Sequence, residues 1–230
     1  IQQITPESAG WNYVGFEVFK LKSSQFLQKN TYQREVCLVI LAGKARIKTK
    51  FESWDTLGER DSVFSKGKDR KGRPPYAIYI PRDDKIHLEA LTDLELAVCS
   101  APSKAKFPAR LIEPENMTYE QRGKDNNTRH ICNILPETAE ADSLLVVEVL
   151  TPNGNWSSYP PHKHDSDNLP NESYLEETYY HRINPPQGFA FQRVYTDDGS
   201  IDETMTVKDH DVVMVPRGYH PVGTPYGYDL

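Results

Sequence analysis

The segment Tyr159–Asp165 carries two histidines one residue apart, His162 and His164. In an extended chain, residues i and i+2 point to the same face, so both imidazoles can reach one metal ion. A carboxylate pair, Glu176-Glu177, follows, and His220 ends a Pro-Arg-Gly-Tyr-His turn. Three histidines and one carboxylate form a nitrogen and oxygen donor set that suits a divalent transition metal. The sequence therefore predicts a metal centre.

Strand alternation separates the two carboxylates. If the segment after them is a strand, Glu177 shares its face with Tyr179 and His181. Glu176 instead shares its face with Arg182, and an arginine is more easily placed on the outside of a barrel. This alternation favours Glu177 as the metal ligand over Glu176.

Other side chains could act beside such a centre. Tyr179 and His181 would share the inward face with Glu177 and are candidates for proton transfer, although His181 could also simply pack inside the fold. Arg193 could bind a substrate carboxylate through a bidentate pair, or be an ordinary surface arginine. Lys163 lies between the two histidines and should point away from the metal.

Composition limits the class of protein. The chain has 230 residues, of which 37% are hydrophobic and 26% charged, with 17 prolines. These values are typical of a globular, loop-rich, β-dominated protein. With a net charge of -6, nucleic acid and membrane are not expected partners. No apolar run approaches the roughly 20 residues that span a bilayer. The three widely spaced cysteines are expected to be buried thiols, which fits the cytoplasm.

Short strand patterns fill the chain. Residues 35–50 are expected to form a hairpin that turns at Ala42-Gly43-Lys44, and no long amphipathic helix is visible. The segment 101–116 holds three prolines and little periodicity, so we place a domain crossover there. The expected division is residues 1–112 and residues 113–230.

A faint internal repeat relates the two halves. Residues 78–87 (IYIPRDDKIH) resemble residues 213–220 (VMVPRGYH), since each has an apolar strand, a Pro-Arg turn and a histidine. Glu35-Val36, before the first turn, is compared in the same way with Glu177-Thr178. An internal repeat predicts two related domains. The first half lacks a counterpart of His162 and His164, so His87 is expected to be an ordinary histidine.

The HxH, the following glutamate and the later Pro-x-Gly-x-His turn resemble the two motifs of the cupin superfamily. Within it, the chain resembles the bacterial 5-deoxy-glucuronate isomerases of inositol breakdown over nearly its whole length. The runs that carry this resemblance are residues 156–165 (WSSYPPHKHD), 175–181 (LEETYYH), 215–221 (VPRGYHP), 34–39 (REVCLV), 94–102 (LELAVCSAP) and 122–127 (RGKDNN).

The resemblance implies an all-β bicupin, two antiparallel jelly-roll β-barrels in tandem, in which the first barrel lacks metal ligands and the second binds the metal. It also implies an aldose–ketose isomerase that converts 5-deoxy-D-glucuronate, a small sugar acid, to 5-dehydro-2-deoxy-D-gluconate. The expected ligands are His162, His164, Glu177 and His220. Zinc is the first expectation for the metal because the chemistry needs no redox change, and manganese is the second.

Some features depart from the general cupin pattern, and alternatives stay open. A polar loop, Asp165–Tyr174, separates the HxH from the glutamate, and one more barrel strand is expected after Leu230. The function could also be that of a 4-deoxy-5-keto-uronate isomerase, of an Fe-dependent dioxygenase that consumes oxygen, or of a non-catalytic sugar-binding cupin. A homo-oligomer is expected, because cupins often associate through strand edges.

Overall fold

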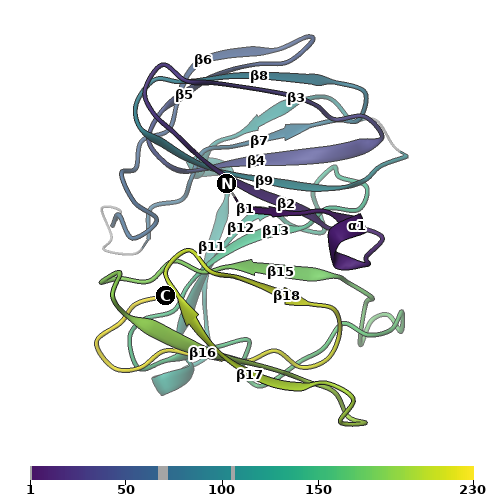
Figure 1. The fold of residues 1–230 in the computed structure, drawn as a ribbon, viewed down its shortest axis with the longest axis vertical. Helices are drawn as coiled ribbons and strands as arrows, with labels where there is room; N and C mark the ends of the chain where they lie inside the picture. Colours follow the sequence, from purple (N-terminus) through teal and green to yellow (C-terminus); the bar gives the residue numbers. More distant parts are fainter. Residues whose placement is uncertain (1, 67–71, 105–106) are drawn as a thin grey trace. The chain divides into compact units, whose positions relative to one another are not determined.

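The structure, a computed structural model, describes residues 2–66, 72–104 and 107–230 (Figure 1). Within these ranges the only α-helix is α1 (Pro6–Ala9), and 3-10 turns lie at η1 (Pro114–Asn116) and η2 (Asp125–Asn127). The other regular elements of the described residues are strands, so the all-β prediction is confirmed. No helix in these ranges is long and apolar enough to cross a membrane.

The chain divides into two compact units. The first comprises residues 1–119 and 132–148, and the second comprises residues 120–131 and 149–230. The first unit therefore includes residues that lie beyond the division expected after residue 112. A third sheet is ordered β11-β12-β13, and each of its strands has some residues in the first unit and some in the second. Its strands are β11 (Thr118–Arg122), β12 (Arg129–Leu135) and β13 (Val146–Leu150).

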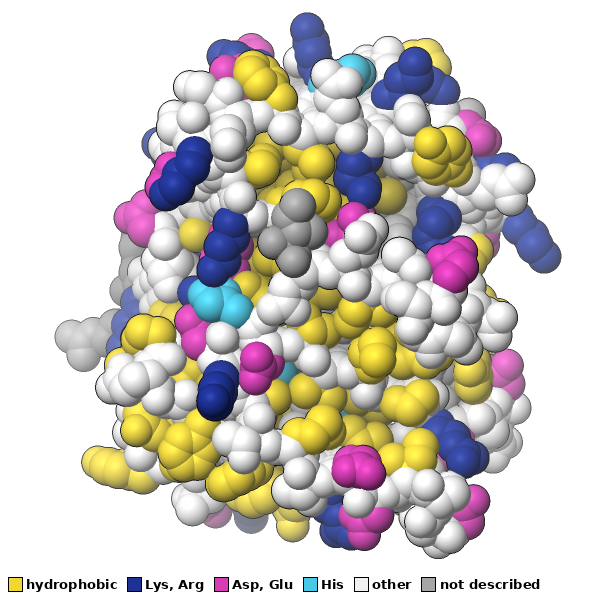
Figure 2. All heavy atoms as spheres, viewed as in Figure 1, with side chains coloured by type: hydrophobic (Ala, Val, Ile, Leu, Met, Phe, Trp, Pro, Cys, Tyr) yellow, Lys and Arg dark blue, Asp and Glu magenta, His cyan; other side chains and the backbone are white. Residues whose placement is uncertain are grey.

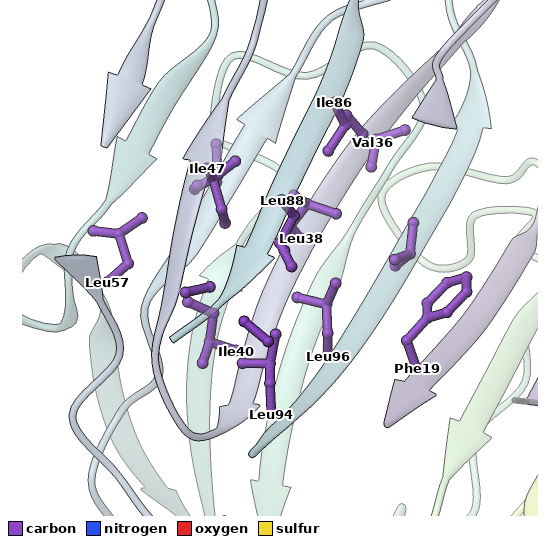
Figure 3. Packing of buried hydrophobic residues seen from close by; sticks show 14 of the residues in the cluster. Phe19, Val36, Leu38, Ile40, Ile47, Leu57, Ile86, Leu88, Leu94 and Leu96 are labelled. Carbon is purple, nitrogen blue, oxygen red and sulfur yellow. The ribbon is translucent and has the colours of Figure 1, made fainter. Parts of the chain in front are cut away.

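Two sheets build the first unit around one apolar core. The larger is ordered β1 (Gln2–Ile4), β2 (Gly15–Leu21), β9 (Leu94–Pro102), β4 (Arg34–Ala42), β7 (Ala77–Ile80) and β10 (Arg110–Ile112). The smaller is ordered β3 (Phe26–Asn30), β8 (Lys85–Ala90), β5 (Ala45–Lys48) and β6 (Ser53–Leu57). Both contribute to the core: Figure 3 shows Leu38 and Leu96 of the larger sheet beside Ile47 and Leu88 of the smaller.

Strand β4 lies inside the larger sheet and is buried on both faces over Glu35–Leu41, where every residue except Glu35 is apolar. It pairs with β9 on one side and β7 on the other. The hairpin predicted at Ala42-Gly43-Lys44 is wrong in one respect: the chain turns there, but β4 and β5 enter different sheets. Gly43 is required at the turn, since its φ is +91° and a Cβ would lie 2.1 Å from the Asp93 carbonyl oxygen.

The second unit contains a sheet and a strand pair around a smaller apolar core. The sheet is ordered β14 (Trp156–Ser157), β19 (Val222–Gly223), β16 (Phe189–Tyr195) and β17 (Asp202–Lys208). The pair is β15 (Glu177–Tyr180) with β18 (Val212–Val215). The core side chains are Ile183, Ala190, Val194, Val207, Val213, Val215 and Val222.

The same strand pairing occurs in both units, as the repeat predicts. In the first unit Val36 of β4 is opposite Ile80 of β7, and in the second Glu177 of β15 is opposite Val215 of β18. Since Ile80 and Val215 each precede the Pro-Arg turn, Val36 occupies the position of Glu177. The comparison of Glu35 with Glu177 is therefore wrong by one residue.

Surface charges of both signs are mixed. On the face drawn in Figure 2, Lys and Arg side chains alternate with Asp and Glu side chains, and hydrophobic atoms lie between them. This agrees with a moderate net charge of -6 over 230 residues.

Replacing a core side chain tests the packing of the first unit. Leu38 is fully buried, so Leu38→Ala is expected to lower the free energy of unfolding by about 2–5 kcal/mol. The control is Phe51→Ala, because Phe51 is 83% exposed and its loss should change that free energy by about 0.5 kcal/mol or less. Urea denaturation measures both, and equal effects would contradict the assigned core.

Candidate metal centre

Three histidines from two separate segments converge in the second unit. His162 and His164 follow β14, and His220 lies between β18 and β19. The ring centroids are 5.0 Å apart for His162 and His164, 4.7 Å for His162 and His220, and 5.5 Å for His164 and His220. One nitrogen from each ring lies within 4.8 Å of the others, a spacing at which three ligands could hold one ion.

Glu177 completes the cluster. It is the first residue of β15, and its Oε2 lies 3.2 Å from Nε2 of His220 and 3.9 Å from Nε2 of His164. Strand alternation directs Glu176, the preceding residue, to the opposite face. The structure thus brings together the four side chains that the sequence nominates as ligands.

The donor atoms of this cluster fit a divalent cation. Among the described residues, Nε2 of His220 and Oε2 of Glu177 are buried without a hydrogen-bond partner. Buried polar atoms are nearly always paired, and leaving one unpaired costs about 1–3 kcal/mol. Imidazole nitrogen and carboxylate oxygen are ligands for zinc and similar ions, so an ion bound here would satisfy both atoms.

The protonation of the histidines also suits metal binding. Nδ1–H of His220 donates to the Gly218 carbonyl oxygen at 2.9 Å, which leaves the lone pair of Nε2 for a metal. Burial lowers the pKa of His162 to about 4, and the neighbouring His220 and His164 add to the effect. Burial, and then His220, also lower the pKa of His164. Both rings are therefore neutral near pH 7.

Tyr179 lies next to the cluster on the inward side of β15. Its ring centroid is 5.9 Å from that of His220, and its hydroxyl is 2.9 Å from Oγ of Ser158. Burial raises the pKa of Tyr179 well above its usual value, and the Glu177 carboxylate raises it further. The hydroxyl therefore stays protonated near neutral pH and can donate a hydrogen bond.

His181 lies one ring further from the cluster. Its ring stacks on Tyr179 at 5.7 Å, and only 4% of the residue is exposed. Nε2–H of His181 donates to Oε1 of Gln192 at 2.9 Å, which leaves Nδ1 as the acceptor. Burial lowers the pKa of His181, so the ring is neutral at neutral pH.

Gln192 is a candidate site residue that the sequence analysis missed. It is fully buried in β16, where Ala190, Gln192 and Val194 face inward. Its Nε2 has no hydrogen-bond partner among the described residues. A polar residue in the middle of an inward-facing apolar series is the signal that could have revealed it.

Arg193 faces the opposite way from Gln192, because neighbouring residues of a strand alternate. Its guanidinium forms a bidentate pair with Asp202 at 2.8 and 2.9 Å and lies 4.2 Å over the ring of Tyr195. The structure does not bring Arg193 to the histidine cluster, so a substrate-binding role gains no support from this geometry.

The first unit lacks this cluster in its described residues. Val36 replaces the glutamate, and His87 is an exposed residue of β8 opposite Gln28. The metal ligands nominated from the sequence all lie in the second unit.

Comparison with known proteins fits this arrangement. The sequence profile of the KduI/IolB family matches residues 1–230. The chain belongs to the KduI/IolB family. One relative, the 5-deoxy-glucuronate isomerase of Geobacillus thermodenitrificans, is 61% identical to this chain, over 100% of this chain and 81% of that protein. That of Bacillus subtilis (strain 168) is 47% identical, over 99% of this chain and 82% of that protein.

Solved structures agree with the bicupin fold. An IolB-like protein from Salmonella typhimurium LT2 is 52% identical, with a TM-score of 0.95 over 100% of this chain and 85% of that chain. Oxalate decarboxylase of Bacillus subtilis has a TM-score of 0.61 at 12% identity, over 99% of this chain and 71% of that chain. The second likeness concerns the fold alone, and the predicted cupin architecture is confirmed.

Metal loading tests the centre directly. His220→Ala removes a buried ligand, so the variant is expected to retain less than about a tenth of the zinc that the unchanged protein binds. His87→Ala is the matched control, because His87 is exposed and lies in the other unit, and it should bind zinc normally. Equilibrium dialysis followed by elemental analysis measures both. Equal zinc in the two variants would contradict the site.

Proposed function

We propose that this protein is a metal-dependent 5-deoxy-glucuronate isomerase. One observation carries the metal dependence: His162, His164, His220 and Glu177 converge, and Nε2 of His220 and Oε2 of Glu177 are buried without hydrogen-bond partners among the described residues. The substrate follows from relatives named 5-deoxy-glucuronate isomerase, which are 47–61% identical over almost the whole chain.

The reaction is an aldose–ketose isomerisation, in which a proton leaves C2 and another is added at C1. The aldehyde becomes a hydroxymethyl group, the C2 hydroxyl becomes a ketone, and no external oxidant or reductant is needed. A divalent ion held by the four side chains supplies Lewis-acid stabilisation of the negative charge that develops on the two oxygens. The chain itself must supply the group that moves the proton.

His181 and Tyr179 are the proposed proton-handling residues. A neutral His181 has an acceptor nitrogen at Nδ1, because Nε2–H is held by Gln192. Tyr179 keeps its proton and is the nearer of the two to His220, so it suits a hydrogen-bond donor to a substrate oxygen. The two roles differ because burial acts in opposite senses on a histidine pKa and a tyrosine pKa.

Zinc is proposed as the ion, with manganese second, because three histidines and a carboxylate accept either and the reaction has no redox step. A homo-oligomer and a cytoplasmic location stay predictions from the sequence.

A proton NMR time course in D2O tests the assignment. Zinc-loaded protein with 5-deoxy-glucuronate should lose the aldehyde-derived signals and gain those of the ketose, and an EDTA-stripped sample should not. Deuterium in the product would indicate a base that exchanges with solvent. If protein with a measured full zinc load leaves the substrate unchanged, the substrate assignment is wrong.

Substitution of the proton-handling residues is expected to slow chemistry without removing the metal. General acid–base groups contribute about 10²–10⁴-fold, so His181→Ala should lower kcat by that factor. Tyr179→Phe keeps the ring and removes the hydroxyl, and it should lower kcat by about 10-fold or more because one hydrogen bond to the transition state is lost. Steady-state kinetics and zinc content are measured together. Normal kcat in His181→Ala with zinc bound would exclude His181 as the base.

Gln192→Glu should move the pH dependence. A carboxylate at Nε2 of His181 favours the imidazolium, so it raises the pKa of His181, which burial lowers in the unchanged protein. The base is lost when His181 is protonated, so the acid limb of kcat/KM should shift to higher pH. Gln192→Leu removes the hydrogen bond and provides the comparison without an added charge. If the acid limb of kcat/KM is unchanged in Gln192→Glu, residue 192 does not influence the pKa of the base.

A further inference from the structure

The ligands of the candidate metal centre come from segments that are far apart in sequence. His162 and His164 lie in what we term the HxH segment (residues 162–165), and His220 ends the ligand turn (residues 216–220). Both belong to the second unit. A site assembled in this way binds a metal tightly only if other contacts keep the two segments at a fixed separation.

The residues interleaved with the histidines contact the ligand turn. Oδ1 of Asp165 accepts a hydrogen bond from the backbone N–H of Gly218 at 2.6 Å. Nζ of Lys163 lies 5.4 Å over the ring of Tyr219 and 2.5 Å from Oδ2 of Asp197. His162 and His164 thus reach the metal centre, while Lys163 and Asp165 reach the turn that carries the third histidine.

Gly218 connects this contact to His220. The N–H of Gly218 donates to Asp165, and the carbonyl oxygen of Gly218 accepts from Nδ1 of His220 at 2.9 Å. Gly218 has a φ of +90°, and a Cβ there would lie 2.4 Å from the carbonyl oxygen of Tyr195. The conformation of the turn at Gly218 is therefore narrowly set, and this one residue is hydrogen-bonded both to Asp165 and to His220.

Asp165 is itself held in place. The backbone N–H groups of Asp165 and Ser166 both donate to Oε1 of Glu172, at 2.6 and 2.8 Å. The carbonyl oxygen of His164 accepts from the N–H of Leu175 at 3.1 Å. The polar loop between the HxH and Glu177 thus fixes the backbone from which Asp165 reaches Gly218.

We propose that Asp165 is a positioning residue of the metal centre, which sets zinc affinity by holding the backbone of Gly218, whose carbonyl oxygen orients His220. This rests on the metal site of the proposed function and not on the identity of the sugar. Asp165 outweighs Lys163 because its Oδ1 makes a direct, part-buried hydrogen bond of 2.6 Å to the backbone of the ligand turn. The ion pair of Lys163 with the largely exposed Asp197 is of the kind that contributes little.

Four variants separate the position of the acceptor from its charge. Asp165→Ala removes the acceptor and Asp165→Glu displaces it by one methylene, whereas Asp165→Asn keeps an acceptor oxygen in place and removes the charge. Asp167→Ala is the matched control, because Oδ1 of Asp167 accepts from the N–H of Tyr174 within the same polar loop. Thermal unfolding of the metal-free proteins checks that each variant folds.

Zinc affinity is measured by competition with a chromophoric chelator at neutral pH. Substitutions of the groups that orient metal ligands lower affinity by about 10–100-fold, so Asp165→Ala and Asp165→Glu should raise the Kd for zinc by that factor. Asp165→Asn and Asp167→Ala should stay within about threefold of the unchanged protein. If Asp165→Ala does not fold, Asp165→Glu against Asp165→Asn gives the same comparison.

The outcomes distinguish the two proposals. Unchanged affinity in Asp165→Ala and Asp165→Glu would overturn the positioning role while leaving the metal site intact. Affinity in Asp165→Asn as weak as in Asp165→Ala would also overturn it, because charge would then outweigh position. If the unchanged protein takes up no zinc or manganese, the metal site of the proposed function fails and this inference fails with it.

Discussion

The register between β15 and β18 is the constraint on which the candidate metal centre depends. Glu177 is opposite Val215, the last residue of β18 before the ligand turn. The turn then returns Nε2 of His220 to 3.2 Å from Oε2 of Glu177. A slip of one residue would exchange the faces of the strand and place Glu176 where Glu177 now lies. Apolar side chains such as Val213 and Val215 oppose such a slip, because their burial in the core fixes the face.

The first unit uses the same pairing with a different result. Val36 takes the place of Glu177 and is buried in an apolar core. The neighbouring Glu35 faces the other way, where its carboxylate accepts hydrogen bonds from the hydroxyl of Tyr79 and from the backbone N–H groups of residues 142–144. Both units thus place a glutamate on this strand: Glu35 is fully buried and hydrogen-bonded, whereas Glu177 is half-buried and its buried Oε2 lacks a hydrogen-bond partner among the described residues. A buried carboxylate that is fully hydrogen-bonded stabilises a fold, whereas an unsatisfied one indicates a ligand.

Sequence patterns predict which residues of a strand share a face. Alternation, with Arg182 placed outside, favours Glu177 over Glu176 and places Tyr179 and His181 on the face of Glu177, because a strand has a period of two. The same rule left Arg193 ambiguous, since both faces of β16 carry apolar residues. Phe189 and Phe191 lie on the face that they share with Arg193, where Phe189 packs against Phe191 and Tyr228. On β16 the large aromatic residues lie on the outer face and a glutamine lies on the inner face, which is the opposite of the usual distribution of apolar and polar residues.

Contacts across long sequence separations lie beyond such patterns. The hydrogen bond between Asp165 and Gly218 joins residues 53 apart, and the turn at Gly43 gives no sign that β4 and β5 enter different sheets. The fold class could be predicted because many short strands with turn residues allow few architectures. The orientation of His220 could not be predicted, because it depends on the backbone of Gly218, whose hydrogen-bond partners are brought together only by the fold.

The burial of His181 and Gln192 in the second unit supports the proposal that these polar residues take part in the reaction. His181 and Gln192 are almost fully buried in the same unit as an apolar core, and Nε2 of Gln192 lacks a partner among the described residues. Apolar residues of similar volume would avoid the desolvation of an amide and an imidazole, which costs on the order of 1–3 kcal/mol for each unsatisfied group. The first unit has apolar residues at the corresponding strand, where Val36, Leu38 and Ile40 of β4 are buried in the core. Stability alone does not require a buried His181 that Gln192 holds in one tautomer, in the same unit as the candidate metal cluster.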